Sequence, residues 1–166
     1  DPKKDAEINI LGALNLIDNC VKHGVKKIIF SSSGGAIYGE KEIIPTSEDA
    51  ETSPESPYGI AKRTIELYLE FYKKVFGLDY VTLRYSNVYG PRQNSKGEAG
   101  VVAIFFENLL NGRTPVVFGD GEQTRDYIFV KDICRFFKKN DLYLLVTLNQ
   151  HKIIKFYHLP IPLSKD

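Results

Sequence analysis

Tyr58 and Lys62 are the residues of this 166-residue sequence whose spacing points most directly to chemistry. Residues four apart lie on one face of a helix, so the phenol and the ammonium can address one small volume. A phenol titrates near ~10 in water, and a fixed cation beside it lowers that pKa because it favours the phenolate. The pair can therefore move a proton to or from an alcohol or sugar hydroxyl near neutral pH.

A helix is predicted to begin directly before this pair. Ser56 is a favourable N-cap. Pro57 suits the first helical position because its fixed φ fits there and its missing N–H has no intrahelical partner anyway. The pattern predicts a helix from Pro57 to about Phe76, ended by Gly77, and then a strand over residues 79–85.

The region before this helix shows a second helix followed by a strand. Apolar residues recur at helical spacing ahead of a predicted C-cap at Gly24, namely Ile10, Leu14, Ile17 and Val21. Residues 27–31 then have the composition of a short buried strand. This succession is the αβ half of a doubly wound unit, so the predicted fold class is α/β with a parallel sheet.

Polar, glycine-containing segments follow both predicted strands. Ser-Ser-Ser-Gly-Gly-Ala-Ile-Tyr-Gly occupies residues 31–39, and Ser-Asn-Val-Tyr-Gly-Pro-Arg occupies residues 86–92. In open parallel sheets the ligand crevice lies at the carboxyl ends of the strands, so both segments lie where chemistry is expected.

The third quarter of the chain is predicted to hold two helices and a hairpin. Residues 100–112 are apolar enough for a packed helix, and residues 115–118 and 125–130 have the composition of two strands around the turn Gly119-Asp120-Gly121. Asp132 can cap one more helix.

The composition excludes several classes of protein. A formal net charge of +1 gives no long-range field for nucleic acid or an anionic membrane, and no apolar run approaches the ~20 residues of a membrane span. The default expectation is a soluble cytoplasmic protein. Cys20 and Cys134 form no CxxC or Cys/His cluster, so we expect both to be small buried side chains and no metal site.

The composition changes after Cys134. Residues 135–166 hold six Lys/Arg against two Asp/Glu, and they contain no glycine and no alanine. One interpretation is a helix and strand of a substrate-capping region, and the other is a divergent tail from a shifted reading frame.

Four separate segments resemble the extended short-chain dehydrogenase/reductase family, and within it the nucleotide-sugar epimerases of the UDP-glucose 4-epimerase type. They are the serine run 31–33, the Tyr58/Lys62 pair, and residues 84–87 and 125–128. The resemblance covers residues 1–134 as a partial NAD-dependent epimerase/dehydratase domain. It implies the C-terminal half of a Rossmann-type sheet and the start of a small substrate-binding region. It also implies NAD as cofactor, a nucleotide-diphosphate sugar as substrate, and a homodimer as a state open to the full-length enzyme.

The resemblance implies that Tyr58 is the catalytic acid/base and that Lys62 holds the nicotinamide ribose and lowers the phenol pKa. Counted from the start of the strand, the serine that binds the substrate hydroxyl corresponds to Ser33, with Ser32 as the alternative. Counting back from Tyr38 reaches Gly34 instead, because this loop is one residue longer than the family's SSSATVYG pattern.

The remaining roles also come from the resemblance, and none is assigned to a metal. The cofactor contacts are Ser31, Ser32, Tyr58, Lys62, Tyr85, Ser86 and Val88. The substrate contacts are Ser33, Asn87, Phe118 and Arg125. Phe118 would line the uracil pocket, and the planar guanidinium of Arg125 would bind the diphosphate. From the residue types alone, Asn87 is equally a loop cap, Phe118 a core residue and Arg125 an ion-pair partner.

The loop also distinguishes between reactions within the family. Related sugar 4,6-dehydratases carry an Asp-Glu pair where this chain has residues 34–36, Gly-Gly-Ala, so elimination of water is not expected. The expected reaction is oxidation of a sugar at C4 to a ketone, followed by re-reduction from the opposite face.

The family's GxxGxxG turn, on which the NAD pyrophosphate rests at a helix N-terminus, does not occur in this sequence. We therefore expect the chain to begin in the fourth helix of the fold, to be truncated at both ends, and to bind NAD weakly by itself. Two hypotheses remain open: a piece of a functional epimerase, and a non-catalytic remnant or interaction fragment of one.

Overall fold

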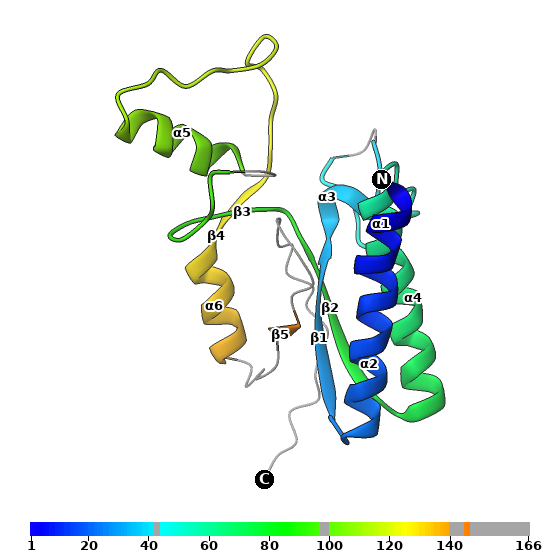
Figure 1. Ribbon diagram of the computed structural model, residues 1–166. Coiled ribbons are helices and arrows are strands. Elements are labelled where there is room, and N and C mark those ends of the chain that lie inside the picture. The colour runs from blue at the N-terminus through cyan, green and yellow to red at the C-terminus, as the bar shows by residue number, and fades with distance from the viewer. Residues whose placement is uncertain (42–43, 97–99, 140–144, 147–166) are drawn as a thin grey trace.

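A parallel sheet with helices on both faces forms the centre of the molecule. The computed structural model describes residues 1–41, 44–96, 100–139 and 145–146. Figure 1 shows α2 (Gly12–Lys22) and α4 (Pro57–Phe76) on one side of strands β1 (Lys27–Ser33) and β2 (Asp79–Tyr85), with α6 (Val130–Lys139) on the other side. The remaining elements are α1 (Pro2–Ala6), the π-helix η1 (Glu7–Leu11), α3 (Gly34–Ile37), β3 (Asn87–Tyr89), α5 (Val101–Leu110), β4 (Tyr127–Phe129) and β5 (Leu145–Val146).

The sheet has the strand order β2-β1-β5 and its pairs are parallel. The register of β1 and β2 runs from Lys27 opposite Asp79 to Ser33 opposite Tyr85. The strands therefore end together, and their carboxyl ends bring the serine run beside the start of the 86–92 segment. This arrangement confirms the predicted α/β class and both main strands, although β1 continues through Ser33 where the prediction ended it at Ser31.

Alternate residues of β1 face two hydrophobic cores. Ile28 and Phe30 pack with α2 and α4, whereas Ile29 packs with Leu83 and Ile133 of α6. All of these side chains are buried. Burying an aliphatic side chain of this size stabilises a fold by roughly 1.5–3 kcal/mol, so both faces of the strand pair need their helices.

Helix α4 has the bounds that its local signals predicted. The Ser56 hydroxyl accepts a hydrogen bond of 3.1 Å from the Gly59 amide, and Pro57 is the first helical residue. At the other end Gly77 adopts the left-handed conformation with φ 69°. These caps fix where the turn that carries Tyr58 begins.

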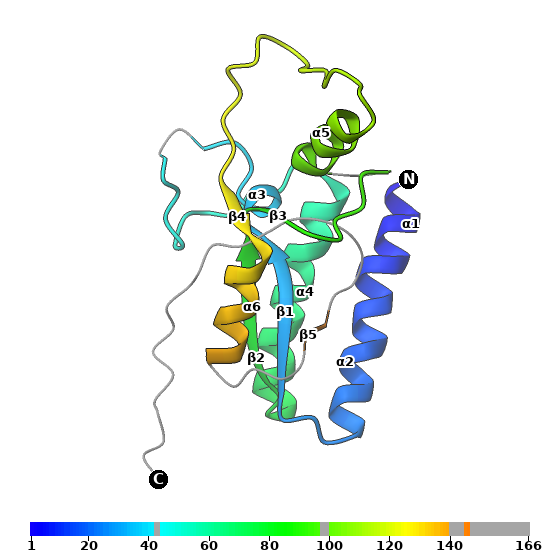
Figure 2. The same cartoon turned by 90° about the vertical axis from the view of Figure 1, so that its left-hand side faces the viewer.

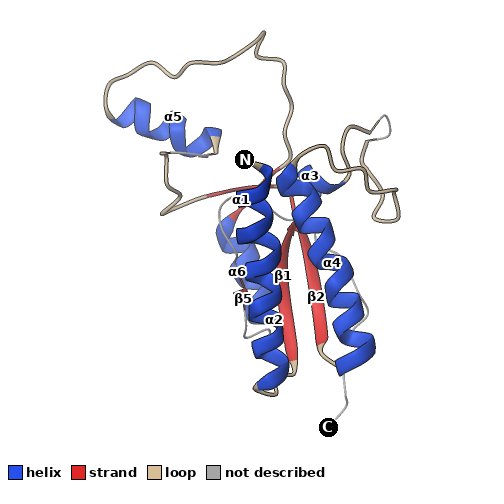
Figure 3. Ribbon diagram, turned by 45° about the vertical axis from the view of Figure 1, so that its right-hand side comes forward, coloured by secondary structure: helices blue, strands red, loops and turns tan. Residues whose placement is uncertain are grey.

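The N-terminal helix is longer than predicted. Asp1 caps α1 by accepting from the Lys3 and Lys4 amides, and α1, η1 and α2 follow one another up to Lys22. Gly24, with φ 69°, follows the C-cap His23 and ends the helix as expected. Figure 3 shows this continuous helix beside α4.

The predicted hairpin of residues 115–130 is wrong. Residues 113–118 have no regular structure, and Val116, Val117 and Phe118 are all exposed. Within the described residues no strand pairs with this segment, so its backbone is not held in a sheet. Instead β4 pairs in parallel with β3, from Asn87 opposite Tyr127 to Tyr89 opposite Phe129. Figure 2 shows this small second sheet above the main one, with α5 beyond it.

Two smaller predictions also fail. Asp132 does not cap α6, because the helix already begins at Val130; it lies in the first turn and pairs with Arg135 at 2.8 Å. Cys20 is buried as predicted, but Cys134 is exposed because it lies on the outer side of α6, away from Ile133.

No helix among the described residues is long and apolar enough to cross a membrane. The predicted change at Cys134 falls within α6; residues 140–144 and 147–166 of that segment lie outside the described residues.

Candidate functional site

Tyr58 and Lys62 lie together at the start of α4. The Nζ of Lys62 is 5.5 Å from the centroid of the Tyr58 ring, which confirms that the two side chains share one face of the helix. At this distance from the ring the ammonium makes a cation–π contact with Tyr58. The two side chains of the predicted acid/base pair are therefore neighbours in the structure.

Lys62 is buried, with 4% of its surface exposed. Its Nζ donates a hydrogen bond of 2.9 Å to the carbonyl oxygen of Ser31 and lies 4.9 Å from the centroid of the Phe30 ring. Burial lowers the pKa of Lys62 to about 8, and the negative charge of Asp5 opposes this shift. The ammonium is thus held at a fixed place at the end of β1.

The three serines of β1 are all buried, but they point to different partners. The Ser31 hydroxyl donates to the Tyr85 hydroxyl at 3.4 Å, and the Ser32 hydroxyl donates to Glu66 Oε1 at 2.6 Å. Burial raises the pKa of Tyr85, and the Ser31 bond opposes this. Ser33 ends the strand and precedes α3.

Helices α3 and α4 are in direct contact beside this segment. A Cβ added to Gly59 would overlap the carbonyl oxygen of Ala36, so the residue next to Tyr58 packs on the backbone that follows Ser33. The structure therefore brings together Tyr58, Lys62 and the serine run, as the sequence predicted.

A second group of predicted residues lines two cavities at the ends of the strands. A cavity of about 310 Å³ is lined by Ser86, Asn87 and Arg125 together with Gly34 and Tyr38. A smaller one of about 110 Å³ is lined by Asn87, Val88 and Arg125. The backbone N–H of Asn87 donates to the Asp126 carbonyl at 2.8 Å, which fixes β3 beside the residue that follows Arg125.

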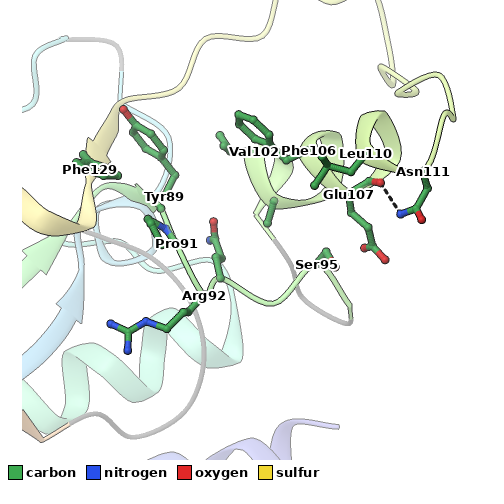
Figure 4. Close-up of a pocket in the computed structure, with 13 residues that line it drawn as sticks. Tyr89, Pro91, Arg92, Ser95, Val102, Phe106, Glu107, Leu110, Asn111 and Phe129 are labelled. Carbon is green, nitrogen blue, oxygen red and sulfur yellow. Dashed lines mark hydrogen bonds between the residues drawn. The ribbon is translucent and has the colours of Figure 1, made fainter.

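Phe118 is not brought into either cavity. It is 81% exposed and belongs to the irregular segment before β4. A further cavity of about 550 Å³ lies between residues 89–95 and α5, and is lined by Tyr89, Val102, Phe106 and Phe129 among others (Figure 4). It contains none of the predicted site residues.

Three residues near the site were missed by the sequence analysis. Asp5 acts on Lys62 through its charge, and the buried Glu66 forms a bidentate ion pair with Arg84. Glu66 had a usable signal, because it continues the four-residue spacing from Tyr58 through Lys62. Arg84 lies in the segment 84–87 that carries the resemblance, but it was assigned no role. The contacts of Asp5 and Arg84 have no local signal, because they depend on how helix and strand pack. Among the described residues no group of three or more His, Cys, Asp or Glu could hold a metal ion.

A parallel sheet covered by helices, with polar cavities at the carboxyl ends of its strands, defines part of a Rossmann-type fold. The chain belongs to the NAD-dependent epimerase/dehydratase family, whose model matches residues 1–139.

Individual members of the family are similar to this chain at high identity. The UDP-glucose 4-epimerase of Mycolicibacterium smegmatis is 49% identical over 133 residues, which are 80% of this chain and 42% of that protein. The crystal structure of Thermotoga maritima UDP-glucose 4-epimerase with UDP-glucose matches with a TM-score of 0.79 and 55% identity, over 81% of this chain and 44% of that one. The crystal structure of the Thermus thermophilus UDP-glucose 4-epimerase complex with NAD matches with a TM-score of 0.78 and 44% identity. The match covers 89% of this chain and 50% of that one. The chain thus spans less than half the length of the curated relatives that it matches.

Proposed function

We propose that this chain carries the acid/base half of an NAD-dependent nucleotide-sugar epimerase of the UDP-glucose 4-epimerase type. The observation that supports this most is Lys62, whose ammonium is buried between the Ser31 carbonyl and the rings of Phe30 and Tyr58. A lysine is buried in this way only where the fold compensates it, and here the compensation places it beside a phenol.

The proton steps follow from this pair. The Tyr58 phenolate accepts the proton of the sugar C4 hydroxyl while the C4 hydride leaves, which gives a ketone, and the phenol returns the proton when the hydride is added to the other face. NAD, when bound, supplies the acceptor and donor of that hydride. Lys62 would hold a positive charge beside the Tyr58 ring, and Ser33 would orient the hydroxyl.

The residues present fit the nicotinamide side of the cofactor. The Ser86 hydroxyl is buried and has no hydrogen-bond partner within the described part of the chain, so it offers an unused polar group beside the cavity of about 310 Å³. We assign Lys62, Tyr58 and Ser86 to the cofactor, with Ser31, Ser32, Tyr85 and Val88 around them. Of these, Ser32 is already engaged by Glu66, which favours Ser33 over Ser32 for the substrate.

Asn87 and Arg125 form the substrate side of the proposal. They line the same two cavities, and the exposed Arg125 side chain donates a hydrogen bond of 2.7 Å to the neighbouring Thr124 carbonyl. Its planar guanidinium suits a diphosphate. Phe118 can serve the uracil only if residues 113–118 move, since it is exposed here.

A homodimer through α4 also belongs to this proposal. Large apolar side chains lie at helical spacing on its outer side and are 39–56% exposed: Ile60, Leu67, Tyr68, Phe71 and Val75. Such a stripe is typical of a face that packs on another helix, and a two-fold axis would let it pack on its own copy. Sedimentation of the native chain and of Phe71→Glu tests this, and a native chain that stays monomeric at high concentration would contradict it.

The alternative function is a non-catalytic remnant or interaction fragment of such an enzyme. If the DNA directly upstream encodes a strand followed by GxxGxxG, the enzyme is favoured. If it does not, the remnant is favoured. We place the protein in the cytoplasm under either alternative, where nucleotide sugars and NAD are available.

The decisive experiment is conversion of UDP-glucose to its C4 epimer by the 166-residue chain, with NAD at millimolar concentration and the products separated by chromatography. Conversion would support the enzyme. A folded chain that neither converts UDP-glucose nor binds it in a calorimetric titration would exclude the proposal for this chain.

A further inference from the structure

The carboxylate of Glu66 is buried in α4 and all of its acceptor positions are occupied. Its Oε1 accepts from Ser32 Oγ at 2.6 Å and from Arg84 Nε at 3.1 Å. Its Oε2 accepts from Arg84 Nη2 at 2.7 Å and from Arg63 Nη1 at 3.0 Å. A carboxylate offers about four lone-pair sites, so Glu66 is saturated and can act only through its partners.

Arg84 extends this network to the loop after α3. Its Nη1 donates to the Tyr38 hydroxyl at 2.6 Å and to the Glu48 carbonyl at 3.4 Å. Arg84 lines the cavity of about 310 Å³ that also holds Asn87 and Arg125. Its guanidinium therefore forms part of that cavity's wall, but four of its five N–H donors are bound to Glu66, Tyr38 and Glu48.

One end of the network lies beside the acid/base pair. Lys62 and Glu66 are one helical turn apart on α4 and bind successive residues of β1, the Ser31 carbonyl and the Ser32 hydroxyl. The next residue is Ser33. Tyr38, at the far end of the network, follows α3. Residues 32–38 are thus held at both ends by the network, at Ser32 by Glu66 and at Tyr38 by Arg84.

Stability alone does not explain a buried ion pair at this place. Replacing such pairs by apolar residues of similar volume is often neutral or stabilising. The same side of α4 continues as apolar core at Ile65, Leu69 and Tyr72, so an apolar residue at position 66 would extend an existing cluster. Directional bonds to two strands do what an apolar side chain cannot: they fix a register.

We propose that Glu66 and Arg84 are positioning residues, which hold the serine run of residues 31–33 against Tyr58 and Lys62 through Ser32 and Tyr38. The catalytic role of Glu66 and Arg84 rests on the proposed function. Their effect on the position of residues 31–33 rests on the geometry alone.

The first test measures the accessibility of Lys62 in the full chain. The native chain, Glu66→Gln, Arg84→Lys and Ser32→Ala are treated with an acetylating ester, and each lysine is followed by peptide mass spectrometry. In the three variants we expect acetylation of Lys62 to accelerate about tenfold or more, because the segment that covers it opens locally. Lys73 and Lys74, in the last turn of the same helix, are the internal references.

Leu69→Ala is the matched control, because Leu69 is buried in the same helix but is not one of the residues of this network. It lowers stability without touching Glu66. An acceleration at Lys62 of the same size in Leu69→Ala, or none in the three variants, would overturn the proposal. Ser32→Ala removes a single hydroxyl, so it decides the matter if Glu66→Gln does not fold.

The second test uses catalysis at millimolar NAD. Arg84→Lys is expected to lower kcat on the order of 10²-fold, because small misplacements of reacting groups have this effect, with KM for UDP-glucose unchanged. A higher KM with unchanged kcat would instead make Arg84 a substrate ligand and overturn the positioning role. If the native chain converts no UDP-glucose, the proposed function fails and the acetylation test still decides the positioning role.

Discussion

Gly59 of α4 packs on Ala36 of α3 so closely that a Cβ at position 59 would overlap the Ala36 carbonyl oxygen and lie 3.0 Å from the Pro54 Cβ. The Ala36 oxygen belongs to the backbone and the Pro54 Cβ to a fixed ring, so neither atom can rotate away. This contact sets the distance between the turn that carries Tyr58 and the segment that follows Ser33.

Gly59→Ala is therefore expected to destabilise the chain by about 1–3 kcal/mol through overpacking. Alanine normally stabilises a helix interior by roughly 0.5–1 kcal/mol relative to glycine, so the sign is diagnostic. Gly12→Ala is the control, because the nearest atom to its Cβ is the Glu7 carbonyl oxygen at 3.8 Å. Urea unfolding measures both, and a Gly59→Ala variant as stable as the native chain would contradict the close packing.

The position of α4 could be predicted because its signals are local. Ser56 and Pro57 mark its start and Gly77 its end within a few residues of sequence, and the structure uses all three. The shared face of Tyr58 and Lys62 then follows from the helical repeat. The pairing of β3 with β4 could not be predicted, because it joins Asn87 to Tyr127 across forty residues. The apolar run at Val116–Phe118 has the composition of a strand, but nothing local shows that it lacks a partner.

Tyr58→Phe is expected to reduce epimerisation by roughly 10²–10⁴-fold, because the proton acceptor is lost while the ring and its packing remain. Stability should stay close to that of the native chain. Tyr80→Phe, on β2 and outside both the proposed site and the exposed face of α4, serves as the control and should leave the rate unchanged. Equal rates for Tyr58→Phe and the native chain would favour the non-catalytic alternative.

Arg125→Lys is expected to weaken UDP-glucose binding by about tenfold, because lysine keeps the charge but loses the bidentate geometry. Arg113→Lys is the matched control, since Arg113 is also exposed but lines none of the cavities that contain Asn87. Calorimetric titration with UDP-glucose compares the two. Arg125 would be excluded as a diphosphate ligand if both variants bound like the native chain.

The Glu66–Arg84 pair shows why part of the site escaped prediction. The four-residue spacing places Glu66 on the face of Tyr58 and Lys62, but Arg63, three residues before it, also gives it the pattern of a solvated surface pair. Its burial is decided by Ser32 and Arg84, which reach it from two strands that are paired only in the folded sheet. The pairing of β1 with β2 brings Ser32 and Arg84 to Glu66, and this pairing cannot be read from the local sequence.

The lowered pKa of Lys62 predicts a pH-dependent stability. Below about pH 8 the ammonium is charged in the folded and the unfolded chain, so the cost of burying it is fully present. Between about 8 and the unfolded value near ~10.4, the folded chain releases the proton first, and stability rises with pH because the unfolded state binds more protons. Urea unfolding of the native chain relative to Lys62→Met should show this gain from pH 7 to pH 10, by up to about 3 kcal/mol. A difference that does not vary with pH would mean that Lys62 is not desolvated.

NAD is expected to bind this chain only weakly by itself. The pyrophosphate of NAD requires a glycine-rich turn that leads into a helix N-terminus, and the glycine pair Gly34-Gly35 instead forms the four-residue helix α3. Lys62 and Ser86 can hold only the nicotinamide side. In a thermal-shift titration, a ligand at 100 times its Kd stabilises by about 2.7 kcal/mol, so micromolar binding would be plain at 100 μM NAD. We expect no saturable shift there, whereas UDP-glucose, whose proposed ligands Asn87 and Arg125 are both in the chain, should give one. Saturation by micromolar NAD would show that the cofactor finds its phosphate contacts elsewhere in these 166 residues.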